Sequence, residues 1–244
     1  MYRQLDPEKI IETAERLRAR IRERFPDSSL SRLAAELVEV ARNARERSAE
    51  IGRPHWPLRA GVGLFAAAVL SALAYGLSQV ELEWRLPDVI TLVQAVEAGT
   101  NELVLAGAAV YFLLSVEKRL KRGRALAALH ELRSLAHVVD MHQLTKDPER
   151  LLRPGPDTAS SPKVSMTAFE LARYLDYCSE VLAVIGKVAA VYAQNFDEEA
   201  ALSAVDEVED LTTGLSRKIW QKLMILDADL RRADATSAPA LPAA

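Results

Sequence analysis

Residues 60–80 read AGVGLFAAAVLSALAYGLSQV, a run without a single charged side chain. At about 1.5 Å per residue, a helix of this length crosses the roughly 30 Å hydrocarbon core of a bilayer. Trp56 precedes the run and Trp84 follows it, where aromatic side chains meet a membrane–water interface. We therefore predict a transmembrane helix over residues 58–80. The alternative is a fully buried helix of a soluble protein.

A second apolar stretch follows this run. Leu103–Val116 is uncharged, but it is short enough that by itself it is also compatible with a buried or re-entrant segment. Only Glu97 and Glu102 carry charge between Asp88 and Glu117, however. A long helix through this region is long enough to span, and we predict a second transmembrane helix over residues 97–117.

The charges that flank the two stretches predict their orientation. Arg53 and Arg59 precede the first stretch, whereas the connection at 81–96 carries more acidic than basic residues. A basic cluster follows the second stretch: Lys118, Arg119, Lys121, Arg122 and Arg124. The positive-inside rule then places both termini in the cytoplasm and the connection outside, with the basic cluster at the anionic inner leaflet.

The remaining segments show helical spacing of apolar residues and no strand pattern, so the fold class is all-α. We expect an αα-hairpin over 1–52, a cytoplasmic helix over 118–152, a linker over 153–163, an αα-hairpin over 164–232 and a disordered tail over 233–244. The segment 1–60 carries a net charge of +3 and the segment 163–244 one of -5. Opposite charge and exposed apolar stripes predict that the two hairpins dock into one bundle.

Composition excludes several classes of protein. The net charge of -3 over 244 residues gives no indication of a nucleic-acid partner. The one cysteine, Cys178, cannot form an intrachain disulfide and is expected to be buried. There is no N-terminal apolar region typical of a cleaved signal peptide. Phosphate loops, nucleophile elbows and zincin motifs are absent from the sequence, so neither a cofactor nor catalysis is expected.

Two features of the apolar stretches have functional interpretations. Ala68, Ala72 and Gly76 recur every four residues, a row that permits close helix packing within the hairpin or between copies. Glu97, Asn101 and Glu102 form a polar group near the outer end of the second predicted span. Intramembrane carboxylates often line a pathway, although Glu102 lies close enough to the outer edge to be hydrated.

The densest polar constellation lies in the predicted 118–152 helix. His130, His137 and Asp140 fall near one helical face, and His137 with Asp140 has the i,i+3 spacing that can chelate a metal. His142 points elsewhere. The simpler interpretation is a polar seam that faces inward, in which carboxylates such as Asp176 or Glu180 raise the histidine pKa values. We predict this seam, without a bound metal.

The run LHELRSLAHVVDMHQLTKDPE at 129–149, following two apolar stretches, resembles a segment of uncharacterised bacterial two-span helical inner-membrane proteins. The resemblance is close over that run and extends to the rest of the chain only in architecture. It implies a multi-pass protein of the bacterial inner membrane, and it carries over no activity or site residue.

Two classes of function are compatible with these patterns. The favoured one is a non-enzymatic, membrane-anchored interaction or regulatory protein that self-associates and binds an unidentified protein partner. The alternative is a small oligomeric channel with Glu97, Asn101 and Glu102 at its outer mouth. A channel needs a polar stripe along its pore, and Leu103–Val116 offers only Tyr111 and Ser115, which favours the interaction protein.

Overall fold

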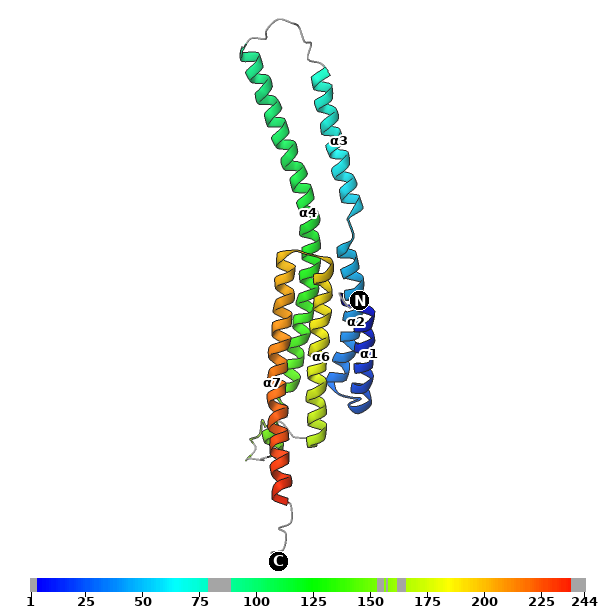
Figure 1. Ribbon diagram of the computed structural model, residues 1–244, viewed down its shortest axis with the longest axis vertical. Helices are drawn as coiled ribbons and strands as arrows, with labels where there is room; N and C mark the ends of the chain where they lie inside the picture. Colours follow the sequence, from blue (N-terminus) through cyan, green and yellow to red (C-terminus); the bar gives the residue numbers. More distant parts are fainter. Residues whose placement is uncertain (1–3, 79–88, 153–155, 157, 162–165, 238–244) are drawn as a thin grey trace, which may run out of the picture. The chain divides into compact units, whose positions relative to one another are not determined.

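The protein is all-helical. The computed structural model describes residues 4–78, 89–152, 156, 158–161 and 166–237, which contain no strand. The helices are α1 (Pro7–Arg24), α2 (Ser29–Gly52), α3 (Trp56–Ser78), α4 (Val89–Leu144), α5 (Pro148–Leu152), α6 (Ala168–Asn195) and α7 (Glu199–Ser237), shown in Figure 1. The chain divides into two compact units, which are described separately: Met1–Gly52 with Ala125–Ala244, called the bundle, and Arg53–Arg124, called the hairpin unit.

Local signals set the helix ends in the bundle. The Asp6 side chain accepts a hydrogen bond from the Glu8 amide at the start of α1, and Pro7 occupies the first helical position, where its missing N–H costs nothing. Between α1 and α2, the Ser28 hydroxyl accepts from the Ser31 amide at 3.1 Å. Thr167 and Glu170 form a capping box at the start of α6.

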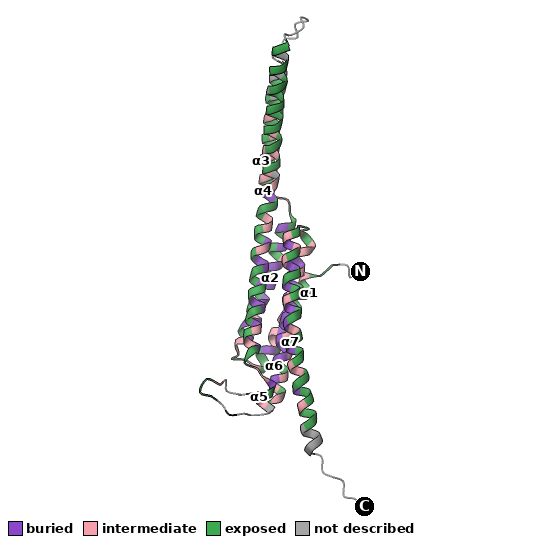
Figure 2. Cartoon of the chain, turned by 90° about the vertical axis from the view of Figure 1, so that its left-hand side faces the viewer, coloured by how far each residue is buried: buried purple, intermediate pink, exposed green. Residues whose placement is uncertain are grey.

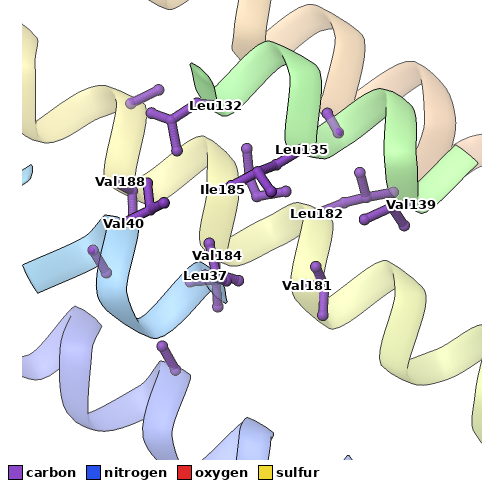
Figure 3. Packing of buried hydrophobic residues seen from close by; sticks show 14 of the residues in the cluster. Leu37, Val40, Leu132, Leu135, Val139, Val181, Leu182, Val184, Ile185 and Val188 are labelled. Carbon is purple, nitrogen blue, oxygen red and sulfur yellow. The ribbon is translucent and has the colours of Figure 1, made fainter. Parts of the chain in front are cut away.

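The core of the bundle lies around α6, whose buried side chains face α2 on one side and α4 on the other. Figure 3 shows Leu37 and Val40 of α2, Leu182 and Ile185 of α6, and Leu132 of α4 converging there. Burying one such aliphatic side chain contributes about 1.5–3 kcal/mol. On another side of α6, Gly186 lies so close to α7 that an added Cβ would stand 3.3 Å from the Thr212 hydroxyl.

The N-terminal helices dock on α6, which confirms the prediction that both terminal hairpins form one bundle. The Ser48 side chain, 1% exposed, donates to the Val191 carbonyl at 3.0 Å and accepts from the Asn195 amide group at 2.8 Å. Nearer the other end of α1, the Arg20 guanidinium pairs with Glu180. The cation of this pair comes from the basic N-terminal segment and the carboxylate from the acidic C-terminal segment. This is the direction that the net charges of the two segments predicted.

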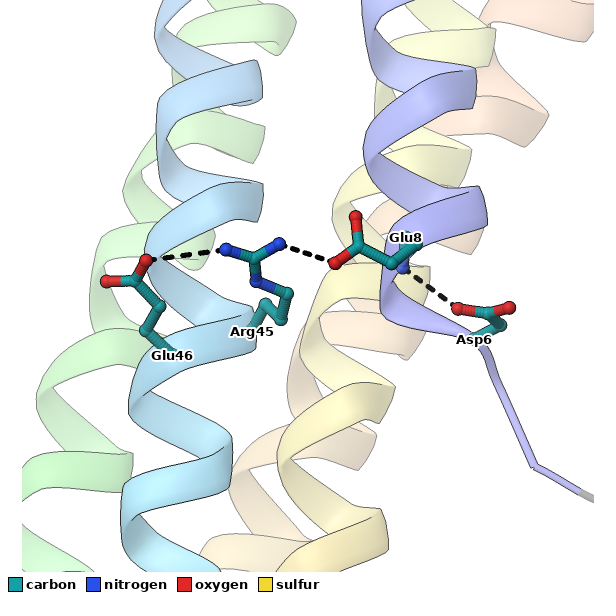
Figure 4. A network of polar contacts seen from close by, with 4 residues as sticks. All are labelled: Asp6, Glu8, Arg45 and Glu46. Carbon is teal, nitrogen blue, oxygen red and sulfur yellow. Dashed lines mark hydrogen bonds and ion pairs between the residues drawn. The ribbon is translucent and has the colours of Figure 1, made fainter.

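Surface ion pairs also join α1 to α2. Arg45 of α2 bridges Glu8 of α1 and its own neighbour Glu46, while Asp6 caps the first turn of α1 beside them (Figure 4). The side chains of Arg45, Glu8 and Glu46 are 41% to 67% exposed. Exposed pairs of this kind contribute little to stability, so they orient the two helices rather than hold them together.

The structure corrects the predicted 118–152 helix. α4 ends at Leu144, and α5 starts at Pro148 after a short break. Proline disfavours helical geometry at the residue before it, and that residue, Asp147, accepts a hydrogen bond from the Glu149 amide and so caps α5. At its other end α4 begins at Val89, so part of the connection predicted over 81–96 is helical. Residues 79–88 lie outside the described residues.

The tail prediction is also corrected in part. α7 continues to Ser237, beyond the predicted end at 232, because residues 233–237 contain neither proline nor glycine. The first proline in this region is Pro239. Residues 238–244 and most of the predicted 153–163 linker lie outside the described residues. Within the linker, Thr158 and Ser161 form a hydrogen-bonded turn.

Candidate functional site

The hairpin unit differs from the bundle in how it exposes apolar side chains. None of the described residues of α3 is buried, and Trp56, Leu64, Leu70 and Tyr75 are each at least 66% exposed. The α4 residues Leu103–Leu105 are 63% to 71% exposed. Figure 2 shows the buried residues concentrated in the bundle and α3 largely exposed. A soluble monomer rarely leaves so continuous an apolar surface in water.

Among the described residues, one stretch, Gly99–Leu151, is long and apolar enough to cross a membrane. Its most apolar 18 residues have a mean hydropathy of 1.4, and none of them is buried. This agrees with a membrane-spanning segment at the second predicted span. The first predicted span, 58–80, lies partly outside the described residues, so the two-span arrangement is not established.

The two described members of the predicted row of small residues do not pack inside the hairpin unit. Ala68 and Ala72 are exposed, and the side-chain surroundings of Gly76 lie outside the description. The partly covered residues of α3 include Leu58, Val62, Ala66 and Val69, and those of α4 include Ala106, Ala109 and Leu113. Their helical spacing indicates that these two rows face each other. Ala68 and Ala72 therefore remain available to a second copy.

A cluster of charged groups joins α3 to α4 within the hairpin unit. Glu117, 8% exposed as a residue, accepts hydrogen bonds from Arg59 Nε at 3.1 Å and from the His55 amide at 3.2 Å. Lys121 Nζ, one helical turn away, lies 3.0 Å from the same carboxylate. One carboxylate thus compensates two cations and also holds the backbone just before α3.

Glu117 accordingly divides the predicted basic cluster into two sets. Lys121 is engaged by Glu117, and its side chain is only 16% exposed. Lys118, Arg119 and Arg124 are exposed, whereas Arg122 is partly covered. The sequence prediction treated these five residues as equivalent. Glu117 was missed, although its i,i+4 spacing to Lys121 and the opposing Arg59 could have indicated it.

The predicted polar group lies on the surface of α4. Glu97, Asn101 and Glu102 are all exposed. Glu97 and Asn101, four residues apart, share a face, and Glu102 lies about 100° further round the helix. The structure therefore brings two of the three together.

The inward-facing histidine seam is wrong. His130 and His137 are exposed, and Asp140 is only partly covered. The face of α4 that packs into the bundle carries Leu129, Leu132, Ala136 and Val139 instead, because burying these apolar groups releases more free energy. The two carboxylates proposed as partners are paired with arginines: Glu180 with Arg20 and Asp176 with Arg173. Among the described residues, no group of three His, Cys, Asp or Glu side chains could hold a metal ion.

His130 instead borders a groove of about 590 Å³ between α4 and α7. The floor is apolar, formed in part by Leu129 and Val208, and Arg133 pairs with Glu207 across it at 2.9 Å. A second groove, of about 610 Å³, lies between α1 and α6 and contains Leu5, Ile10 and Val184. Both grooves are shallow surfaces with an apolar floor and polar edges.

The histidine that the sequence analysis set aside has a distinctive environment. His142 Nδ1 lies 3.3 Å from the Ser29 hydroxyl at the start of α2. Burial lowers the pKa of His142 from its usual 6.5, and the nearby cations Arg32 and Lys146 lower it further. The raised pKa was predicted for the His130 and His137 seam, and no shift was predicted for His142. Burial is the main cause of the lowered pKa of His142, and neighbouring cations add to it.

A second group of polar side chains lies near the end of α4. Lys222 Nζ donates to the Gln143 carbonyl at 2.6 Å, which satisfies a carbonyl in the last turn of the helix. Burial lowers the pKa of Lys222, while Asp147 and Asp140 oppose that change. Cys178, as predicted, is fully buried, and burial raises the pKa of its thiol to about 12. A thiol in this state is not a nucleophile near neutral pH.

Comparison with known protein families, with curated proteins and with solved structures found no match to the chain.

Proposed function

We propose that the protein is a non-enzymatic, membrane-anchored interaction or regulatory protein, held in a bacterial inner membrane by a two-span hairpin. The observation that supports this most is the contrast between the two units. The bundle encloses a continuous apolar core, whereas α3 and the part of α4 before residue 117 expose their apolar side chains. A bilayer would cover that surface, and the charges flanking it favour cytoplasmic termini.

In this proposal the bundle is the working surface. Its two apolar-floored grooves, at α4–α7 and at α1–α6, offer places where a helix of a protein partner could bind. Self-association belongs to the same proposal, because Ala68 and Ala72 are exposed on α3 and allow a second copy to approach closely.

Cysteine accessibility tests the topology. In a Cys178→Ala background, Glu83→Cys lies in the predicted outer connection and Ala159→Cys in an exposed part of the 153–163 linker. An impermeant maleimide added to intact cells should label position 83 and should label position 159 only after permeabilisation. Labelling of both positions in intact cells, or of neither, would contradict the two-span arrangement.

Crosslinking tests self-association. Paired cysteines at Ala68 should form a disulfide between copies in membranes, and Ala72→Leu should reduce its yield by blocking close approach. Val62→Leu is the matched control, because Val62 is partly covered on the face toward α4. An unchanged yield in Ala72→Leu would argue against this contact.

A further inference from the structure

The end of the hairpin unit where the chain enters α3 and leaves the second predicted span has an excess of cations. Residues 53–59 and 117–124 together contribute seven basic side chains and one acidic side chain. The basic residues are Arg53, Arg59, Lys118, Arg119, Lys121, Arg122 and Arg124. Glu117 pairs with both Arg59 and Lys121, whereas the exposed cations of this set need a counterion from elsewhere.

Four of the remaining cations are open to an external anion. Arg53, Lys118, Arg119 and Arg124 are exposed and form no ion pair with the described residues. Lys118 and Arg119 follow Glu117 directly and project about 100° and about 200° round the helix from it, away from the side that contacts Arg59. They therefore present their charge outward while Glu117 holds the inner pair.

An aromatic side chain lies near the Glu117 end of this group of cations. The hydrogen bond from the His55 amide to Glu117 places the next residue, Trp56, near Glu117, which directly precedes Lys118. Trp56 is 71% exposed. An indole ring next to exposed lysine and arginine side chains is the composition that favours the headgroup layer of a membrane, where the ring is partly immersed and the cations meet phosphates.

We propose that four exposed cations bind the headgroups of anionic phospholipids: Arg53, Lys118, Arg119 and Arg124. Trp56 lies in the same headgroup layer of the membrane. Glu117 is the positioning residue that holds Arg59 and Lys121 away from the lipid. The inference rests on the proposed membrane anchoring and goes beyond the predicted placement at the anionic leaflet, because it separates the cations that bind lipid from those that Glu117 holds. It also assigns unequal roles to Lys118 and Lys121, which lie on one helix within a single turn of each other.

Quenching of Trp56 fluorescence by brominated lipids tests the proposal. The full chain, with Trp84→Phe and Trp220→Phe so that Trp56 is the remaining tryptophan, is reconstituted into bilayers of equal phosphatidylcholine and phosphatidylglycerol. Bromine is placed on one lipid or on the other, at the same total amount. Enrichment of anionic lipid should make brominated phosphatidylglycerol the stronger quencher by about twofold, and high salt should reduce the difference.

Two single substitutions provide the matched comparison. Lys118→Gln and Lys121→Gln change the net charge equally, but only Lys118→Gln removes an outward cation, so it should reduce the lipid preference while Lys121→Gln retains most of it. Equal losses in both variants would overturn the division of roles.

The outcomes separate the two proposals. Equal quenching by both brominated lipids in the chain with Lys118 and Lys121 intact would overturn the lipid selectivity and leave membrane anchoring intact. Absence of quenching by either lipid would mean that Trp56 is outside the bilayer, which would contradict the anchoring itself. At matched ionic strength, replacing chloride by inorganic phosphate should leave the preference unchanged, because the surface binds lipid headgroups collectively. Loss of the preference in phosphate alone would identify a free-anion site instead.

Discussion

At the scale of single residues, Glu117 has the most concentrated set of partners in the described part of the hairpin unit. Two cations and one backbone amide converge on a carboxylate whose side chain is 11% exposed. A charged group in such a position is stabilising only while its partners are present. Its neighbour Arg59 is 52% exposed, so solvent screens part of that interaction.

We expect Glu117→Gln to loosen the start of α3. The amide can still accept a hydrogen bond but no longer compensates Arg59 and Lys121, at a cost of about 1–2 kcal/mol. Amide hydrogen exchange over residues 54–62 should therefore quicken by roughly 5- to 30-fold. Glu50→Gln is the control, because Glu50 is exposed and forms no ion pair with the described residues. Unchanged exchange in Glu117→Gln would show that the cluster does not stabilise this segment.

His142 gives the bundle a pH dependence with a definite sign. Its folded-state pKa lies below the ordinary value of 6.5, so the folded protein binds this proton less readily than the unfolded chain. The contribution to stability is fully present above the unfolded pKa and is lost as the pH falls through the folded one. Lowering the pH from about 7.5 to about 5 should therefore reduce the free energy of unfolding of the bundle.

The variant His142→Gln should show a smaller loss of stability over the same pH range, measured by denaturant titration. Carboxylates elsewhere titrate in both proteins, so the difference between them isolates the imidazole. His137→Gln is the matched control on the same helix, because His137 is exposed. Identical pH profiles for the parent and His142→Gln would refute the assignment.

At the scale of elements, the capping box of α6 is the clearest case of a sequence signal that sets a helix end. The Glu170 amide donates to the Thr167 hydroxyl at 3.2 Å, and the Thr167 amide donates to the Glu170 carboxylate at 2.8 Å. Thr167→Ala should destabilise the bundle by about 1 kcal/mol, seen as a lower denaturant midpoint. Thr213→Ala, an exposed site within α7, should be neutral or slightly stabilising. Equal effects of the two would argue against capping.

The same scale shows where sequence reasoning succeeded and failed. Asp6, Ser28 and Thr167 carry their information locally, so the helix starts near them were predictable. The orientation of α4 could not be predicted in the same way. This helix has an aliphatic face and a histidine-bearing face, and its local sequence does not decide which of the two packs into the bundle. Which side is buried depends on the surfaces of α6 and α7, and the apolar face around Leu132 fits them.

Polar contacts between residues far apart along the chain could not be predicted from the sequence either. Ser48 and Val191 lie far apart along the chain, and nothing in either local pattern indicates the hydrogen bond between them. Lys222 and Gln143 form a similar case. Glu117 is intermediate, since one of its partners is local and the other is brought in by the packing of α3 on α4.

At the scale of the whole molecule, two exposed aliphatic side chains should respond differently to the same substitution. Leu70 of α3 is 66% exposed, and Ile225 of α7 is 40% exposed. In water alone, arginine would be tolerated at either position. If α3 spans a bilayer, Leu70→Arg places a charge within it at a cost of about 2.5–3.5 kcal/mol, whereas Ile225→Arg remains in water.

We therefore expect Leu70→Arg to reduce labelling of Glu83→Cys by an impermeant maleimide in intact cells, because an alanine- and glycine-rich span has little hydrophobic free energy in reserve. Ile225→Arg should leave that labelling unchanged. Neither substitution removes a buried side chain, so the bundle should keep its helical content and its denaturant midpoint in both variants. Equal labelling in Leu70→Arg and Ile225→Arg would mean that the exposed surface of α3 is covered by something other than lipid, and a second copy of the chain would then be the first candidate to test by crosslinking.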